Sequence, residues 1–167
     1  MAGKRVAESS VVMAQIMNPQ NANPAGNVHG GFIMYLIDSA AGSAAIRHAR
    51  SNVVTASIDR LDFHNPVFIG DMVTLRAGVN FVGRTSLEVG VRVEAENLLT
   101  GVRRHTASAY LTLVALDPQG RPLPLLPLIL ETDEEKRRHV EAKERRAMRL
   151  AEKTKEKQCQ IDNHCIV

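Results

Sequence analysis

The pattern of apolar positions divides the chain into one central helix and several strands. Residues 30–49 are apolar nearly all round, and small side chains fill the middle of this segment. A helix that is apolar on every side is normally buried. We therefore expect residues 30–49 to form a helix enclosed by the core of the fold.

Five further segments have the pattern of strands. Residues 71–82, 86–97 and 103–116 alternate between apolar and polar side chains, while residues 10–17 and 52–63 are rich in aliphatic residues and are followed by Asn-Pro pairs. Alternation with a polar outer face indicates an antiparallel sheet that is packed on one side. The element order predicts an α+β fold, in which one curved antiparallel sheet wraps around one helix.

The last third of the chain has a different character. Prolines in residues 117–130 exclude a regular helix or a central strand. Residues 131–157 hold ten Lys/Arg and eight Asp/Glu at helical spacing and begin with the capping box Thr132-Asp-Glu-Glu135, so we predict a charged helix. The chain is thus divided into a lead (1–8), a main domain (9–120), a proline-rich connection (121–130), this helix and a flexible tail (158–167).

Composition narrows the possible partners. A net charge of +3 and an aromatic content of 4% argue against a nucleic-acid surface. Cys159 and Cys165 lie in the last nine residues, so the main domain has no disulfide framework, and with His164 they provide too few ligands for a predicted metal site. The sequence has no apolar run of the roughly 20 residues that a membrane span needs and no apolar signal core, so we expect a cytoplasmic protein.

The candidate chemistry centres on a carboxylate inside the apolar helix. Asp38 follows Gly31 by seven residues, which places the two on one helical face. A charge on so apolar a helix is costly to bury unless it is partnered or used. Gly30 and Gly31 stand at the start of the helix, where free amides can bind an oxyanion. The alternatives are an Asp38 satisfied by backbone amides and glycines that only allow close packing.

Several motifs in fixed order carry a family resemblance. They are Asn23-Pro-Ala-Gly-Asn-Val-His-Gly-Gly31, Asp38, Val53-Val-Thr-Ala-Ser-Ile-Asp59, Phe63-His-Asn-Pro-Val67, Gly70-Asp71 and Val82-Gly-Arg-Thr-Ser86. Together they resemble the hotdog-fold acyl-CoA thioesterases, in particular the broad-range acyl-CoA hydrolases. The resemblance covers about residues 8–120.

The resemblance implies a function and a set of site residues. It implies hydrolysis of an acyl-CoA to CoA and a carboxylic acid, with no cofactor beyond the CoA of the substrate. It implies that Asp38 is the catalytic carboxylate and that Asn23, from the neighbouring subunit, is its polar partner. The segment Gly83-Arg84-Thr85-Ser86 matches one that lies along CoA in such enzymes. It also implies a dimer that usually assembles further into a hexamer, as a trimer of dimers.

Thioester chemistry leaves several roles open. Asp38 can act as general base or attack the carbonyl directly, and the amides of Gly30 and Gly31 can hold the oxyanion. Arg103, beside Arg104 at a strand end, either meets the CoA phosphates or is a solvated edge residue. Asp38 lies about 10 Å along its helix from Gly31, so we hypothesise a site shared between two antiparallel helices of a dimer.

Two rival functions remain at this point. A hotdog hydratase or dehydratase pairs a histidine with an acid. Here the candidate acid faces Asn and Gly, and His29 falls in a motif of the thioesterase type, where it caps the helix or packs beside it. A non-catalytic acyl-CoA-binding protein is the other alternative.

Overall fold

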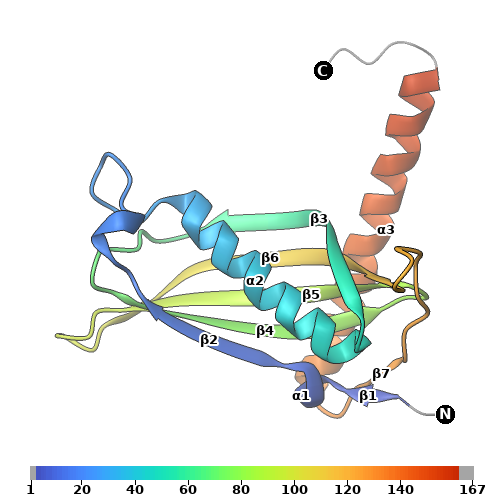
Figure 1. Ribbon diagram of the computed structural model, residues 1–167, viewed down its shortest axis with the longest axis horizontal. Helices are drawn as coiled ribbons and strands as arrows, with labels where there is room; N and C mark the ends of the chain where they lie inside the picture. Colours follow the sequence, from blue (N-terminus) through green and yellow to red (C-terminus); the bar gives the residue numbers. More distant parts are fainter. Residues whose placement is uncertain (1–2, 162–167) are drawn as a thin grey trace.

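The computed structural model describes residues 3–161. Its main feature is a five-stranded antiparallel sheet crossed by one long helix, α2 (Gly30–Ala49), as Figure 1 shows. The strand order is β2-β4-β5-β6-β3. The strands are β2 (Val11–Ile16), β3 (Asn52–Phe63), β4 (Met72–Val82), β5 (Ser86–Glu96) and β6 (Arg103–Leu116). The predicted α+β fold is confirmed, and α2 has the predicted bounds.

Short elements lie before and after β2 and within the proline-rich connection, and the sequence did not predict them. They are β1 (Lys4–Arg5), α1 (Val6–Ser9), the 3-10 turn η1 (Pro19–Asn21) and β7 (Leu128–Ile129). Strands β1 and β7 pair in parallel, which joins the start of the chain to the proline-rich connection. The Lys4 ammonium donates to the carbonyls of Arg47 and His48 at 2.7 and 2.8 Å, where a cation complements the C-terminus of α2.

The core lies between α2 and the face of the sheet turned toward it, here called the inner face. Four alanines of α2 are completely buried and let the helix backbone lie close to the strands. They are Ala40, Ala41, Ala44 and Ala45. The alternating apolar residues of the strands point at them, among them Val73, Leu75, Val89, Val93, Leu111 and Leu113.

The prediction that α2 is enclosed on all sides is wrong for the single chain. One stripe of the helix is exposed and includes Met34, Tyr35, Asp38 and Ile46, with Tyr35 at 64% exposure. The sheet reaches only part of the way round the helix because β3 is its last strand. The apolar side chains of Val54 and Ile58 on this edge strand are exposed as well.

The sheet is also covered on its outer face, which corrects the prediction of packing on one side only. Helix α3 (Asp133–Ile161) lies across that face, visible behind the sheet in Figure 1. Ala142 is fully buried there, and His139 Nδ1 bonds the carbonyl of Asn80 at 3.0 Å. Polar residues on the outer face of the sheet therefore serve as partners for a charged helix.

Helix α3 continues to Ile161, four residues beyond its predicted end at 157. Residues 162–167 lie outside the described residues, as does the side chain of Cys159, so the predicted tail and its cysteines are largely not described. Within residues 3–161, no helix is long and apolar enough to cross a membrane.

The burial of His48 predicts a pH-dependent stability. Its Nε2 donates to the Leu126 carbonyl at 2.9 Å, and its Nδ1 is buried without a partner among the described residues. Desolvation by burial, the largest cause, lowers the pKa of His48 below 6.5. The unfolded chain therefore binds more protons between the two pKa values, and stability decreases as the pH falls through this interval.

We expect the free energy of unfolding, measured by urea denaturation, to decrease from pH 7.5 to pH 5 and to decrease less in His48→Gln. The pKa of His105 is also lowered, mainly by burial. Because His105 is present in both proteins, the difference between the two pH profiles isolates His48. Equal pH dependence in both proteins would contradict this assignment.

Candidate functional site

Asp38 lies on the exposed stripe of α2 and is held by one hydroxyl group. The Thr55 Oγ1 on β3 donates to Asp38 Oδ1 at 2.7 Å. Within the described residues nothing donates to Oδ2, so one carboxylate oxygen is free on the open side of the helix. Asp38 is thus not a buried residue satisfied by backbone amides.

Thr55 was missed by the sequence analysis as a site residue. It follows Val53 in the phase of β3 that points toward α2, and its pairing partner on β6 is Leu113, which is buried in the core. The sequence offered one signal for this role: Thr55 is a polar residue at a position where the strand pattern expects an inward-facing apolar one, and it lies in a motif quoted above. What the sequence does not show is that this position faces the carboxylate 17 residues earlier.

The loop before α2 fixes Asn23 through its side-chain oxygen. Asn23 Oδ1 accepts from the amides of Ala25 and Asn27 at 2.9 and 3.2 Å, which is the geometry of an Asx turn. The side-chain amide Nδ2 has no acceptor among the described residues. Asn23 is therefore a turn residue whose NH₂ group is oriented and available to donate.

His29 is the N-cap of α2. Its Nδ1 accepts from the Gly31 amide at 2.9 Å, so the lone pair that a general base needs is already used. The same bond occupies the Gly31 amide, which is not free for an oxyanion in this arrangement. The Gly30 amide has no partner among the described residues and keeps that capacity.

A cavity of about 380 Å³ opens beside the start of α2. Asn23, Gly30 and Ile33 line it together with Phe63 and Thr106. Neither Asp38 nor Thr55 is part of its wall. One chain therefore brings Asn23 to Gly30 and Asp38 to Thr55, but it does not bring the two pairs together.

The predicted CoA-binding residues fall at two ends of the sheet. Arg84 and Thr85 lie in the turn between β4 and β5, and Ser86 is the first residue of β5. The carbonyls of Arg84 and Thr85 accept from the amides of Leu125 and Ala115 at 2.9 and 3.0 Å. Through Val114, Ser86 lies on the same sheet row as Val54, next to Thr55.

Arg103 is the first residue of β6 and pairs with Glu96, the last residue of β5. It therefore lies about 34 Å from Ser86, the first residue of β5, at 3.4 Å per residue. Its guanidinium pairs with Glu96 at 2.9 Å. Its neighbour Arg104 is a structural residue, since it pairs at 2.5 Å with the buried Asp71. One chain therefore does not place Arg103 beside Arg84.

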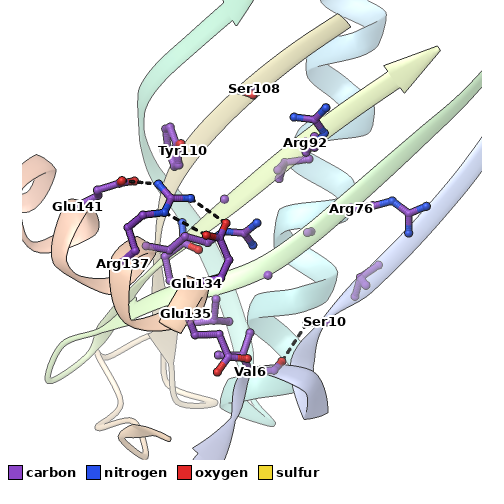
Figure 2. A pocket seen from close by; sticks show the side chains of 18 of the residues that line it. Val6, Ser10, Arg76, Arg92, Ser108, Tyr110, Glu134, Glu135, Arg137 and Glu141 are labelled. Atoms are coloured by element: carbon purple, nitrogen blue, oxygen red, sulfur yellow. Dashed lines mark hydrogen bonds and ion pairs between the residues drawn. The ribbon is translucent and has the colours of Figure 1, made fainter. Parts of the chain in front are cut away.

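A larger cavity of about 410 Å³ lies on the outer face, between the sheet and the first turns of α3 (Figure 2). Arg137 faces Glu134 and Glu141 there and pairs with both at 2.7 and 2.5 Å. None of the predicted site residues lines this cavity. Within the described part of the chain, no cluster of three or more His, Cys, Asp or Glu is arranged to hold a metal ion.

Comparison with known proteins identifies the family. Residues 25–102 match the thioesterase superfamily model. An uncharacterized acyl-CoA thioester hydrolase of Bacillus subtilis is 41% identical over 138 residues, which are 83% of this chain and 80% of that protein. This chain belongs to the thioesterase superfamily. A cytosolic acyl coenzyme A thioester hydrolase of Rattus norvegicus is 36% identical over 84% of this chain, which spans only 37% of that protein's length.

Solved structures agree in fold. A hexameric acyl-CoA thioesterase superposes with a TM-score of 0.88 at 39% identity, covering 91% of this chain and 97% of the other. The Staphylococcus aureus acyl-CoA hydrolase, solved with butyryl coenzyme A and coenzyme A, gives 0.87 at 34% identity over 96% and 97% of the two chains. A hexameric hotdog-fold thioesterase of Campylobacter jejuni gives 0.65 at 35% identity over 76% and 93%. The predicted hotdog fold and the likeness to acyl-CoA thioesterases are confirmed.

The cap assignment of His29 makes a testable prediction. His29→Ala should lower the free energy of unfolding by about 1 kcal/mol, because the cap accepts one of the orphan amides of α2. His29→Asn should retain most of this stability, since asparagine is a strong N-cap. Urea denaturation of the three proteins measures both changes. An alanine variant of unchanged stability would show that the cap contributes nothing.

Proposed function

We propose that this chain hydrolyses acyl-CoA thioesters to CoA and a carboxylic acid, with Asp38 acting at the thioester carbonyl. The observation that carries the proposal is the pairing of Asp38 with Thr55 on the open stripe of α2. A carboxylate whose one oxygen is fixed by a hydroxyl and whose other oxygen is free is oriented to activate water or attack a carbonyl.

The sequence separations between Asn23, Asp38 and Thr55 support a shared role for these residues. Alanine variants of an asparagine, an aspartate and a threonine of the Staphylococcus aureus enzyme have been solved. In that protein the asparagine precedes the aspartate by 15 positions, and the threonine follows it by 17. Asn23, Asp38 and Thr55 have the same two separations here. We infer that the three residues form one site.

A second copy of the chain would complete that site. Gly30 and Asp38 are about 12 Å apart along α2 at 1.5 Å per residue, too far for one carbonyl to contact both. The exposed stripe of α2 and the uncovered edge of β3 both carry exposed apolar side chains and lie side by side, as expected for surfaces that pair with a two-fold related copy. Antiparallel pairing would set Asp38 of one subunit against Asn23 of the other. By analogy with the hexameric neighbours, we propose a trimer of such dimers.

In this arrangement each group has a defined task. Asp38 is the general base or the nucleophile, and Asn23 Nδ2 with the Gly30 amide donates to the carbonyl oxygen as charge develops on it. Arg84, Thr85 and Ser86 lie at the Asp38 end of the sheet and would contact CoA. Arg103 would reach CoA only across the dimer, and no cofactor is needed. As the rat relative is named cytosolic, we propose a cytoplasmic location.

The decisive test is thiol release from acyl-CoAs of increasing chain length. We expect Asp38→Asn to lower kcat by about 10²–10⁴-fold, the usual contribution of a general base, while it keeps an oxygen that accepts from Thr55. Asp133→Asn removes a carboxylate that is 99% exposed on α3 and should leave kcat unchanged. No release by the wild-type chain from any acyl-CoA, although it binds CoA, would refute hydrolysis and favour a binding protein.

The role of Asn23 is tested by a substitution that preserves the turn. Asn23→Asp keeps an oxygen acceptor for the amides of Ala25 and Asn27, and it replaces the Nδ2 donor with a negatively charged acceptor. We expect kcat to fall by about 10²–10³-fold, as for loss of an oxyanion donor, with little change in the melting temperature. A rise in KM alone would instead assign Asn23 to substrate binding.

Sharing of the site is tested by mixing the two inactive variants. Randomly recombined Asp38→Asn and Asn23→Asp subunits should recover about a quarter of wild-type activity, because half of the dimers are mixed and each has one intact site. Subunit exchange is verified with two different affinity tags. Exchange without recovered activity would place both residues of a site in the same subunit.

A further inference from the structure

The strand that carries Thr55 is irregular next to this residue. In the pairing of β3 with β6, Thr55 faces Leu113 and Ser57 faces Thr112, so Ala56 has no partner. A second irregularity follows, in which Ile58 and Arg60 are paired and Asp59 is left without a partner. Such β-bulges re-aim side chains and are common next to active sites. As β3 is an edge strand, only β6 holds this segment from within the sheet.

The outer face of the bulged segment is held by a cluster around Asp59. Ser57 Oγ donates to Asp59 Oδ1 at 2.7 Å, and Thr112 Oγ1 donates to Oδ2 at 3.0 Å. The third donor is Arg149 of α3, whose Nη1 bonds the same Oδ2. The side chains of Asp59 and Arg149 are only 8% and 14% exposed. A nearly buried charge in a closed set of partners resists displacement.

Helix α3 has a second, matched anchor one turn earlier. Arg145 donates to both carboxylate oxygens of Glu88 at 2.7 and 3.1 Å and stacks over the Tyr110 ring at 3.7 Å. Glu88 lies on β5, in the middle of the sheet, and Arg145 is 15% exposed. The two arginines are thus alike in burial and chemistry. They differ in the strand that they hold. Among the side chains of α3 that the structure describes, only Arg149 forms a hydrogen bond to a residue of β3.

We propose that Arg149 and Asp59 are positioning residues, which lock the bulge of β3 so that the Thr55 hydroxyl meets Asp38. The proposal rests on the proposed hydrolysis. Thr55 points to α2 and Asp59 points to α3, so the two residues lie four positions apart on opposite faces of one strand. The C-terminal helix therefore helps to set the geometry of a carboxylate on the far side of the sheet. Neither Arg149 nor Asp59 touches the substrate.

The test compares Arg149→Met with Arg145→Met. Each variant leaves one nearly buried carboxylate without its arginine, so both should lose stability. We expect Arg149→Met to lower kcat on the order of tenfold with little change in KM, because misplacement of a catalytic group is costly. Arg145→Met should retain kcat. Arg149→Lys should restore most of the activity, since a single donor suffices at Asp59.

A double-substitution cycle asks whether the effect passes through Thr55. In a Thr55→Val background, Arg149→Met should cause no further loss of kcat, because the hydroxyl that it positions is absent. An equal loss of kcat in Arg145→Met and Arg149→Met would overturn the proposal. So would a loss from Arg149→Met that is undiminished in the Thr55→Val background.

Hydrogen exchange without substrate separates this inference from the proposed function. The amides of residues 55–58 should exchange faster in Arg149→Met than in Arg145→Met, whichever reaction the wild-type chain catalyses. If the wild type hydrolyses no acyl-CoA, the proposed function fails while exchange still decides whether Arg149 holds the bulge. Equal exchange in both variants would overturn the positioning role.

Discussion

The contact between α2 and the inner face of the sheet is the constraint on which the rest of the structure depends. The four buried alanines of α2 lie on two successive turns, and their small side chains let the strands pack close to the helix backbone. A sheet of five strands cannot surround the helix, so one stripe of α2 stays open beside the edge strand. Asp38 is on that stripe and takes its only described donor from the same edge strand.

The open stripe has consequences for the chemistry. In the isolated chain, the carboxylate with its threonine occupies one region, and the asparagine with the free glycine amide occupies another, beside the cavity at the start of α2. Each region alone lacks half of what thioester hydrolysis needs, a base and a set of donors. The apolar side chains that flank Asp38 are those that a second copy would cover. Assembly and catalysis are therefore linked by the same surface in our proposal.

The charged helix α3 performs a task that its composition does not suggest. Its arginines pair with carboxylates that would otherwise be buried without a charged partner on the outer face, Glu88 in the centre and Asp59 at the edge. Burying paired charges is rarely a strong source of stability compared with apolar packing. Their value here lies in geometry, because each pair fixes the position of α3 against one particular strand.

Much of this architecture can be predicted from the sequence, because local patterns decide it. The alternation of residues 71–116 indicates antiparallel strands, the small apolar residues of 30–49 predict the central helix, and the motif from Asn23 to Asp38 indicates the chemistry. Tertiary structure alone decided the strand order, the open stripe of α2, the use of the Gly31 amide by His29 and the pairing of Thr55 with Asp38. The strand order, the open stripe and the Thr55–Asp38 pair depend on contacts between residues distant in the chain. The use of the Gly31 amide depends on which acceptor takes that single donor. Periodicity reports which face a residue occupies, whereas the identity of its partner is set only when the elements pack.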